Sequence, residues 1–243
     1  MLSGIPVTTY KNDRKPDAYL LELSEGFLAG VKKGDAQQEQ AALAGLTTKR
    51  LLEGLGNDAA KKVFWMNVYN GWYQLEALRN RPDPENIYTE KLIHFSDISL
   101  SLDDIEHGIL RRYRWKYSLG YLPQFFPDSF IKKMAVKSLD YRIHFALNCG
   151  AKSCPPIVLY NYENLDTQLE QATHRFILAE TEIDDKQRRV YTSRILSWYR
   201  GDFKSAGGIN AFLGNTLNKD LTGYKVVFNE YDWTEYLNNF EKD

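Results

Sequence analysis

The chain has 243 residues, enough for one large domain or two small ones with a substantial core. Its charges almost cancel, with 31 lysines and arginines against 32 aspartates and glutamates. The densest basic run, residues 111–116, is typical of the solvated end of a helix. The composition therefore indicates no nucleic-acid footprint, and no apolar run reaches the length of a membrane span.

Apolar residues at a helical period predict two helices in the first fifty residues, over 17–31 and 37–44. A long helix follows, which Asn57 or Asp58 can cap and which the segment 81–84, with its two prolines, closes. Because the centre of this long helix is apolar nearly all round, we expect it to be buried.

The second half of the chain mixes helices and strands. Ser101, followed three residues later by Asp104, resembles a capping box for a helix over 105–115. The short apolar run 143–147 predicts a buried strand. The remaining expected elements are an amphipathic helix over 164–179, a strand over 188–191, a helix over 206–213 and a strand over 224–231.

These elements predict a single α+β domain over 1–243, rich in helix and with a small antiparallel sheet. Residues 1–56 are expected to form a helical extension packed on the core. Residues 1–11 lack the shape of a signal peptide, so the compartment is cytoplasmic as the sequence stands, and periplasmic or secreted if a leader was removed.

Both cysteines and one of the four histidines fall within residues 144–154. Cys149 lies in a turn of small residues after the expected strand, and Cys154 precedes two prolines. Reactive groups are often placed where a rigid element gives way to a loop. A helical turn capped by Asn148 would put Cys149 at its positive end and lower the pKa of that thiol. Both cysteines are therefore candidate nucleophiles, although free cysteines are often simply buried and this pair could form a local disulfide in an exported protein.

His144 is the natural candidate base, but on a straight strand it points away from Cys149. The chain must therefore bend before Cys149, or return at Cys154, for a histidine to meet a thiol. The alternative is a core histidine bonded to backbone. Glu106 and His107 offer another acid and base, and adjacent helical residues diverge by about 100°, so we do not expect these two to pair with each other.

Asn67 and Asn70 interrupt the apolar face of the long helix, and buried amides must be hydrogen-bonded. They either connect neighbouring loops or, with Asn148, help to hold an oxyanion. The histidines lack the spacing of a catalytic metal site, and the cysteine spacing is poor for structural zinc. We therefore expect no metal and no cofactor.

Several segments together resemble the DUF547 family. They are Phe64–Asn70, Leu102–Arg111, His144–Pro156, Ser197–Phe203 and Tyr231–Trp233. The family is similar to papain-like and transglutaminase-like cysteine hydrolases, which implies a thiol, a histidine and a carboxylate. A circularly permuted order of these groups would map onto Glu106, then His107 or His144, then Cys149 or Cys154. Plant members often carry serine at the position of Cys154, so either Cys149 is the nucleophile or those members are inactive.

The sequence thus predicts a cysteine-dependent hydrolase or amidase that acts on a peptide-like or small amide substrate. The rival hypothesis is a non-catalytic binding or scaffold module, in which Asn67, Asn70 and His144 hold the fold and both cysteines are inert or paired. A third hypothesis is a redox role through a Cys149–Cys154 bond.

Overall fold

The computed structural model describes residues 15–79 and 86–241. The expected features at residues 1–11 and 81–84 lie outside these ranges. The helices are α1 (Ala18–Lys33), α2 (Gln37–Ala44), α3 (Thr48–Gly54), α4 (Asp58–Leu78), α5 (Ser129–Met134), α6 (Leu165–Glu180), α7 (Ile195–Trp198) and α8 (Ile209–Leu217). The short 3-10 helices are η1 (Asn86–Tyr88), η3 (Lys116–Ser118), η4 (Tyr141–Phe145) and η5 (Asp202–Ala206), and η2 (Asp104–Leu110) is a π-helix. The strands are β1 (Ile93–His94), β2 (Ser99–Leu100), β3 (Glu182–Asp184), β4 (Arg189–Thr192) and β5 (Lys225–Phe228).

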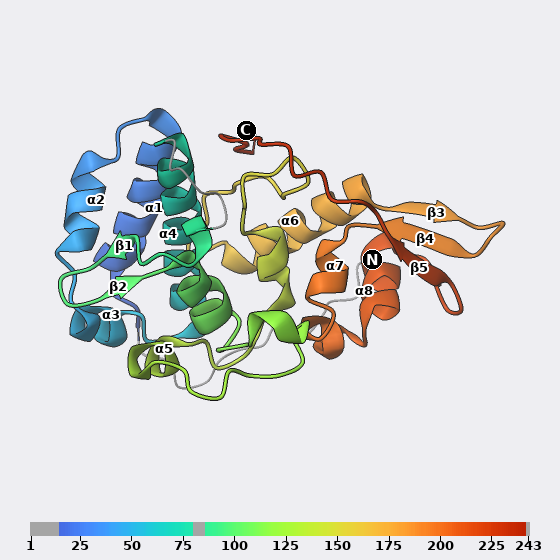
Figure 1. Ribbon diagram of the computed structural model, residues 1–243, viewed down its shortest axis with the longest axis horizontal. Helices are drawn as coiled ribbons and strands as arrows, with labels where there is room; N and C mark the ends of the chain where they lie inside the picture. The colour runs from blue at the N-terminus through green and yellow to red at the C-terminus, as the bar shows by residue number, and fades with distance from the viewer. Residues whose placement is uncertain (1–14, 80–85, 242–243) are drawn as a thin grey trace.

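The α+β architecture expected from the sequence is confirmed. Helices α1 to α4 form the body at one end of the molecule, and β3 to β5 project at the other end beyond α6 to α8 (Figure 1). Strands β1 and β2 form an antiparallel pair, as do β3 and β4, whereas β5 joins β4 in parallel. Among the described helices, none combines the length and the apolar character needed to cross a bilayer.

The long helix α4 begins where the sequence predicts. The Asn57 side chain accepts a hydrogen bond from the Ala60 amide at 2.8 Å, as expected of an N-cap. Helix α1 packs along α4 so closely that a Cβ added at Gly71 would lie 2.5 Å from the Phe27 ring. Glycine at this position therefore permits the contact between the two helices.

The buried hydrophobic side chains form two clusters that meet at η4. The larger cluster includes α1, α4 and Ile143, and the smaller one includes Phe145, Phe203 and Phe212. The prediction of a strand over 143–147 is wrong, because neighbouring side chains here enter different clusters instead of alternating between two faces of a sheet. The Asp140 side chain caps this turn by accepting from the Arg142 amide at 3.1 Å.

The capping box before η2 is confirmed, since Ser101 and Asp104 each accept a hydrogen bond from the other's amide, at 3.1 and 2.7 Å. The helix expected over 105–115 is shorter, because Arg112 and Tyr113 adopt positive φ angles that a helix cannot continue through. The whole of η2 is a π-helix, and the Arg111 amide that follows it donates to the Glu106 carbonyl at 2.8 Å. Such helices are rare and frequently lie at functional sites.

Candidate functional site

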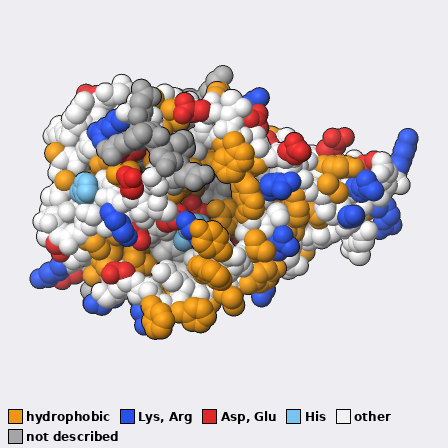
Figure 2. Space-filling model, viewed as in Figure 1, with side chains coloured by type: hydrophobic (Ala, Val, Ile, Leu, Met, Phe, Trp, Pro, Cys, Tyr) orange, Lys and Arg blue, Asp and Glu red, His pale blue; other side chains and the backbone are white. Residues whose placement is uncertain are grey.

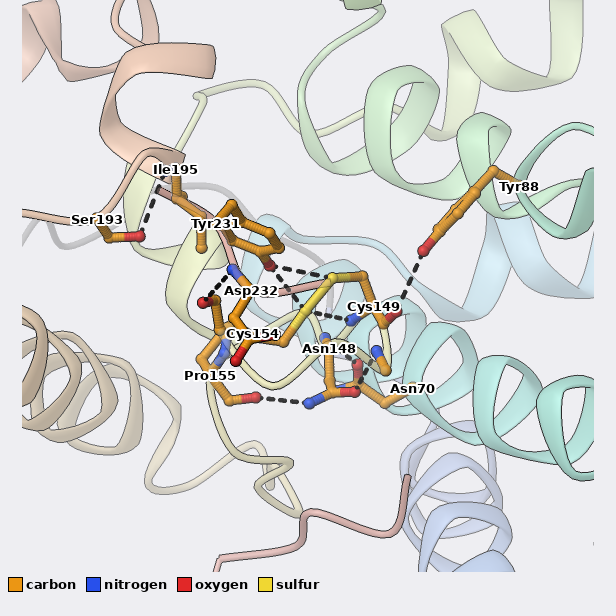
Figure 3. The surroundings of a disulfide bond; sticks show 12 residues. Asn70, Tyr88, Asn148, Cys149, Cys154, Pro155, Ser193, Ile195, Tyr231 and Asp232 are labelled. Atoms are coloured by element: carbon orange, nitrogen blue, oxygen red, sulfur yellow. Dashed lines mark hydrogen bonds between the residues drawn. A yellow bond between two sulfur atoms is a disulfide. The ribbon is translucent and has the colours of Figure 1, made fainter. Parts of the chain in front are cut away.

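The turn that carries both cysteines is held by two buried amides (Figure 3). Asn70, from α4, donates to the Ala146 carbonyl and accepts from the Asn148 amide, both at 2.9 Å. Asn148 in turn accepts from the Gly150 amide at 2.8 Å and donates to a carbonyl on the far side of the turn at 2.7 Å. The long helix therefore fixes the position of this loop through side-chain amides.

Asn67 has a similar role one helical turn earlier. Its amide group donates to the Tyr160 carbonyl at 2.8 Å and accepts from the Tyr160 amide at 3.1 Å. Because its oxygen and nitrogen both bind backbone, as do those of Asn70, these contacts favour the structural role over a contact with an oxyanion.

The two cysteine sulfurs are bonded to each other, with their Cα atoms 6.1 Å apart. Cys154 is buried, whereas Cys149 is half-buried. Residues 148–154 contain no helical turn, so no helix N-terminus lies at Cys149. Gly150 has a φ of +72°, and a Cβ added there would lie 2.5 Å from the Tyr73 ring, so the turn requires glycine.

The hydroxyl of Tyr231 contacts both sulfurs, at 3.2 Å from Cys149 and 3.0 Å from Cys154 (Figure 3). Within the described residues, neither sulfur is hydrogen-bonded to a histidine. Burial is the main cause that raises the pKa of Tyr231 above its usual value, and the charges of Glu180 and Glu106 raise it further. Tyr231 is therefore a neutral donor beside the sulfurs.

A buried group of charged side chains lies where the two hydrophobic clusters meet. Arg111 Nε donates to Asp202 Oδ2 at 2.8 Å, and His144 Nε2 lies 2.8 Å from the same oxygen. All three side chains have side-chain exposures of 1 % or less. The expectation that residues 111–116 are a solvated helix end is wrong for Arg111, because its carboxylate partner holds it inside.

Opposing effects set the protonation of this group. Burial alone would raise the pKa of Asp202, but the hydrogen bond from His144 and the buried Arg111 guanidinium outweigh burial and lower it. For His144, burial is the largest cause and lowers the pKa, although Asp202 opposes the shift. We therefore assign an ionised Asp202 that accepts from Arg111 and from the Nε2–H of a neutral His144. The Nδ1 of His144 is left without a hydrogen bond to any described residue.

Glu106 lies beside this group and accepts hydrogen bonds from Tyr199 at 2.7 Å and from Tyr69 at 3.2 Å. The Tyr199 ring stacks on His144 with a centroid distance of 3.9 Å, and the Arg111 guanidinium lies 4.5 Å from its centroid. Burial would raise the pKa of Glu106, but the charges of His107 and Arg111 and the Tyr199 hydroxyl lower it overall. Tyr199 thus joins Glu106 to the Arg111–Asp202–His144 group.

His107 accepts a hydrogen bond from Arg111 Nη1 at its Nδ1, over 2.7 Å. The same Nδ1 lies 3.7 Å from Glu106 Oε1, which is too long for a hydrogen bond, so these adjacent side chains approach each other without forming a dyad. The π-type turn changes the spacing of successive side chains, and the straight-helix argument does not apply to it. Burial lowers the pKa of His107, and Glu106 partly opposes this shift.

The structure therefore brings Glu106, His107 and His144 together, with the bonded cysteines on a separate turn. The sequence reasoning proposed no role for Arg111, Tyr199, Asp202 or Tyr231. Each of the four nevertheless lies in a segment already singled out by its resemblance, 102–111, 197–203 or 231–233. Within the described residues, no group of histidine, cysteine and acidic side chains is arranged to hold a metal ion.

These features define a helix-rich α+β domain with a buried histidine–carboxylate–arginine group and a cysteine pair. The family model "Protein of unknown function, DUF547" matches residues 53–177, about half of the chain. The chain therefore belongs to the DUF547 family. No curated protein and no solved structure matches the chain. The similarity to papain-like and transglutaminase-like hydrolases accordingly stays a prediction.

Proposed function

We propose that the protein is a cysteine-dependent hydrolase that acts on peptide-like amide bonds in its reduced state, and that the Cys149–Cys154 disulfide is the resting form. The observation that carries the proposal is the His144–Asp202 pair, with Nε2 engaged by the carboxylate and Nδ1 free of hydrogen bonds to described residues. A carboxylate that orients one ring nitrogen leaves the other as a base, which is the arrangement of thiol and serine hydrolases.

The cysteine pair must be reduced before a thiol can attack. A dithiol reductant of the medium supplies two electrons and two protons, the S–S bond breaks to give two thiols, and the reductant becomes a disulfide. Cys149 is then the better nucleophile, because it is half-buried whereas Cys154 is 5 % exposed. The neutral Tyr231 hydroxyl would donate a hydrogen bond to the thiolate, which lowers the pKa of the thiol.

The remaining groups have supporting roles in this proposal. His144 takes the proton of the Cys149 thiol as the sulfur attacks the amide carbonyl, gives it to the leaving amine as the C–N bond breaks, and water then hydrolyses the thioester. Asp202 orients His144, and Glu106 positions the Tyr199 ring against it through a hydrogen bond at 2.7 Å. His107 is the alternative base, although its Nδ1 already accepts a hydrogen bond from Arg111. Separation of the sulfurs on reduction would allow Cys149 to turn towards the histidine, since catalytic hydrogen bonds often form only in the working complex.

The test compares reduced and untreated protein. Iodoacetamide labelling followed by peptide mass mapping should find neither cysteine labelled before reduction. After reduction, Cys149 should label at neutral pH faster than a cysteine in an unstructured peptide. Release of amine from a set of peptide amides should require reductant in the wild type. The Cys154→Ser variant cannot form the disulfide and should be active without reductant, whereas Cys149→Ser and His144→Gln should be inactive.

Labelling of reduced Cys149 no faster than the peptide control would contradict an activated thiol. That result would favour the second candidate, a non-catalytic binding or scaffold module. The bonded sulfurs and the amides of Asn67 and Asn70, whose partners are backbone groups, support this alternative. In a scaffold, replacing both cysteines with serine would lower stability by about 2 kcal/mol, the value expected for so short a loop, and change nothing else.

A further inference from the structure

A single segment carries most of the exposed hydrophobic surface. Twelve large hydrophobic side chains of the described residues are exposed, and seven of them lie within residues 115–126. Phe125 and Phe126, at 80 and 92 % exposure, are the most exposed of all. Isolated exposed hydrophobic residues are normal, but a contiguous group marks a surface that another phase or molecule covers.

This segment has a fixed shape, so the aromatic side chains are presented by ordered backbone. The Trp115 amide donates to the Leu122 carbonyl at 3.0 Å, and the Gln124 amide donates to the Tyr113 carbonyl at 2.6 Å. Residues 113–124 thus form a hairpin, and the Gly201 amide donates to the Leu119 carbonyl at 2.8 Å and ties the tip of this hairpin to the body. A surface held in this way loses little conformational entropy when it docks.

Basic side chains flank the aromatic ones. Arg112, Lys132 and Lys133 are exposed, whereas Lys116 pairs with Asp103 at 2.7 Å. Residues 112–134 contain five lysines and arginines and one acid, in a chain whose net charge is −1. Figure 2 shows hydrophobic side chains gathered along the lower edge of the molecule, where this segment lies in Figure 1.

We propose that the segment 112–134 docks on a bilayer that contains anionic phospholipids. Phe125 and Phe126 insert at the acyl boundary, and Trp115 lies at the level of the headgroups, where tryptophan and tyrosine are enriched. Lys132 and Lys133 contact the lipid phosphates. A second copy of the chain fits less well, because a symmetric contact would place the same basic flanks against each other.

The test is flotation of the purified full chain with vesicles of phosphatidylcholine, with and without phosphatidylserine. Binding should require phosphatidylserine and weaken with added salt. The Phe125→Ser/Phe126→Ser variant should bind roughly tenfold to a hundredfold more weakly, because it lacks the two aromatic rings that the bilayer would otherwise bury. Lys132→Glu/Lys133→Glu should lose the dependence on phosphatidylserine. Leu178→Ser is the matched control, because Leu178 is an exposed hydrophobic residue on α6 and should not affect binding.

Circular dichroism melting curves verify that each variant is folded. If the Phe125/Phe126 variant is unfolded, the binding of the Lys132/Lys133 variant decides the test. Failure of the wild type to float with either vesicle overturns the proposal, as does equal binding by all variants. Analytical ultracentrifugation of the same proteins tests whether a second copy of the chain covers this surface instead. A dimer that depends on Phe125 and Phe126, without vesicle binding, would assign the surface to a second copy and also overturn the proposal.

Discussion

The Asp202→Asn substitution tests whether the buried charged group holds the two hydrophobic clusters together. The wild-type carboxylate accepts from Arg111 and His144, each at 2.8 Å, and Asp202 is 4 % exposed. Asparagine keeps the size of the side chain but removes the charge. The Arg111 guanidinium is fully buried and stays charged, so it loses its hydrogen-bonded counter-ion.

Breaking one side of a buried ion pair typically costs about 3–5 kcal/mol, because the other charge stays desolvated. Domains of this kind have about 5–15 kcal/mol of stability in total, so the variant should lose a large part of it. The corresponding fall in the melting temperature is roughly 6–20 °C for a chain of this length. The double variant Arg111→Met/Asp202→Asn should recover part of the loss, because the guanidinium that Asp202 neutralises is then no longer buried.

Equilibrium urea unfolding followed by tryptophan fluorescence measures these differences. Asp185→Asn is the matched control, since Asp185 pairs with Lys219 at the surface, where solvent screens the charges. We expect little change in the control. The buried ion pair does not have the role assigned to it if Asp202→Asn is no less stable than the control. The same holds if the double variant loses as much unfolding free energy as the two single variants together.

Three further predictions follow from the same contacts. Asn70→Ala removes both hydrogen bonds that fix the cysteine turn and should lower the unfolding free energy by about 2–4 kcal/mol, and dithiothreitol should then reduce the disulfide faster. Gly150→Ala should cost at least about 1 kcal/mol in thermal unfolding, because of its positive φ and the nearby Tyr73 ring. Burial lowers the pKa of His144 and His107, so the unfolded chain binds protons first as the pH falls. The unfolding free energy should therefore be greatest above about pH 6.5 and decrease below it, by up to about 1.4 kcal/mol per pH unit for each histidine. Urea unfolding at several pH values measures this slope, and His144→Gln should reduce it.

Local signals in the sequence were sufficient for several elements and insufficient for the site. The Asn57 cap and the Ser101–Asp104 box depend on residues three positions apart, so spacing alone predicts them. The turn η4 was mistaken for a strand because its apolar residues enter two clusters that sequence periodicity cannot distinguish. Tertiary packing here overrides the local pattern.

The contacts of the buried charged group could not be predicted from the sequence either. Arg111 stands in a basic run and looks solvated, but its partner Asp202 lies 91 residues further along the chain. Tyr231 likewise meets Cys149 over a separation of 82 residues. Pairs at such distances leave no periodic signal in one sequence. Segment resemblance identified the stretches but not the contacts between them.

The buried carboxylate of Asp202 lies between His144 and the exposed hairpin. Asp202 accepts from His144 on one side, and a Cβ added at Gly120 would lie 2.4 Å from its other oxygen, Oδ1. Gly120, with a φ of +86°, is the residue after Leu119 at the tip of the exposed hairpin. A side chain larger than hydrogen at Gly120 would therefore press directly on the carboxylate that orients His144.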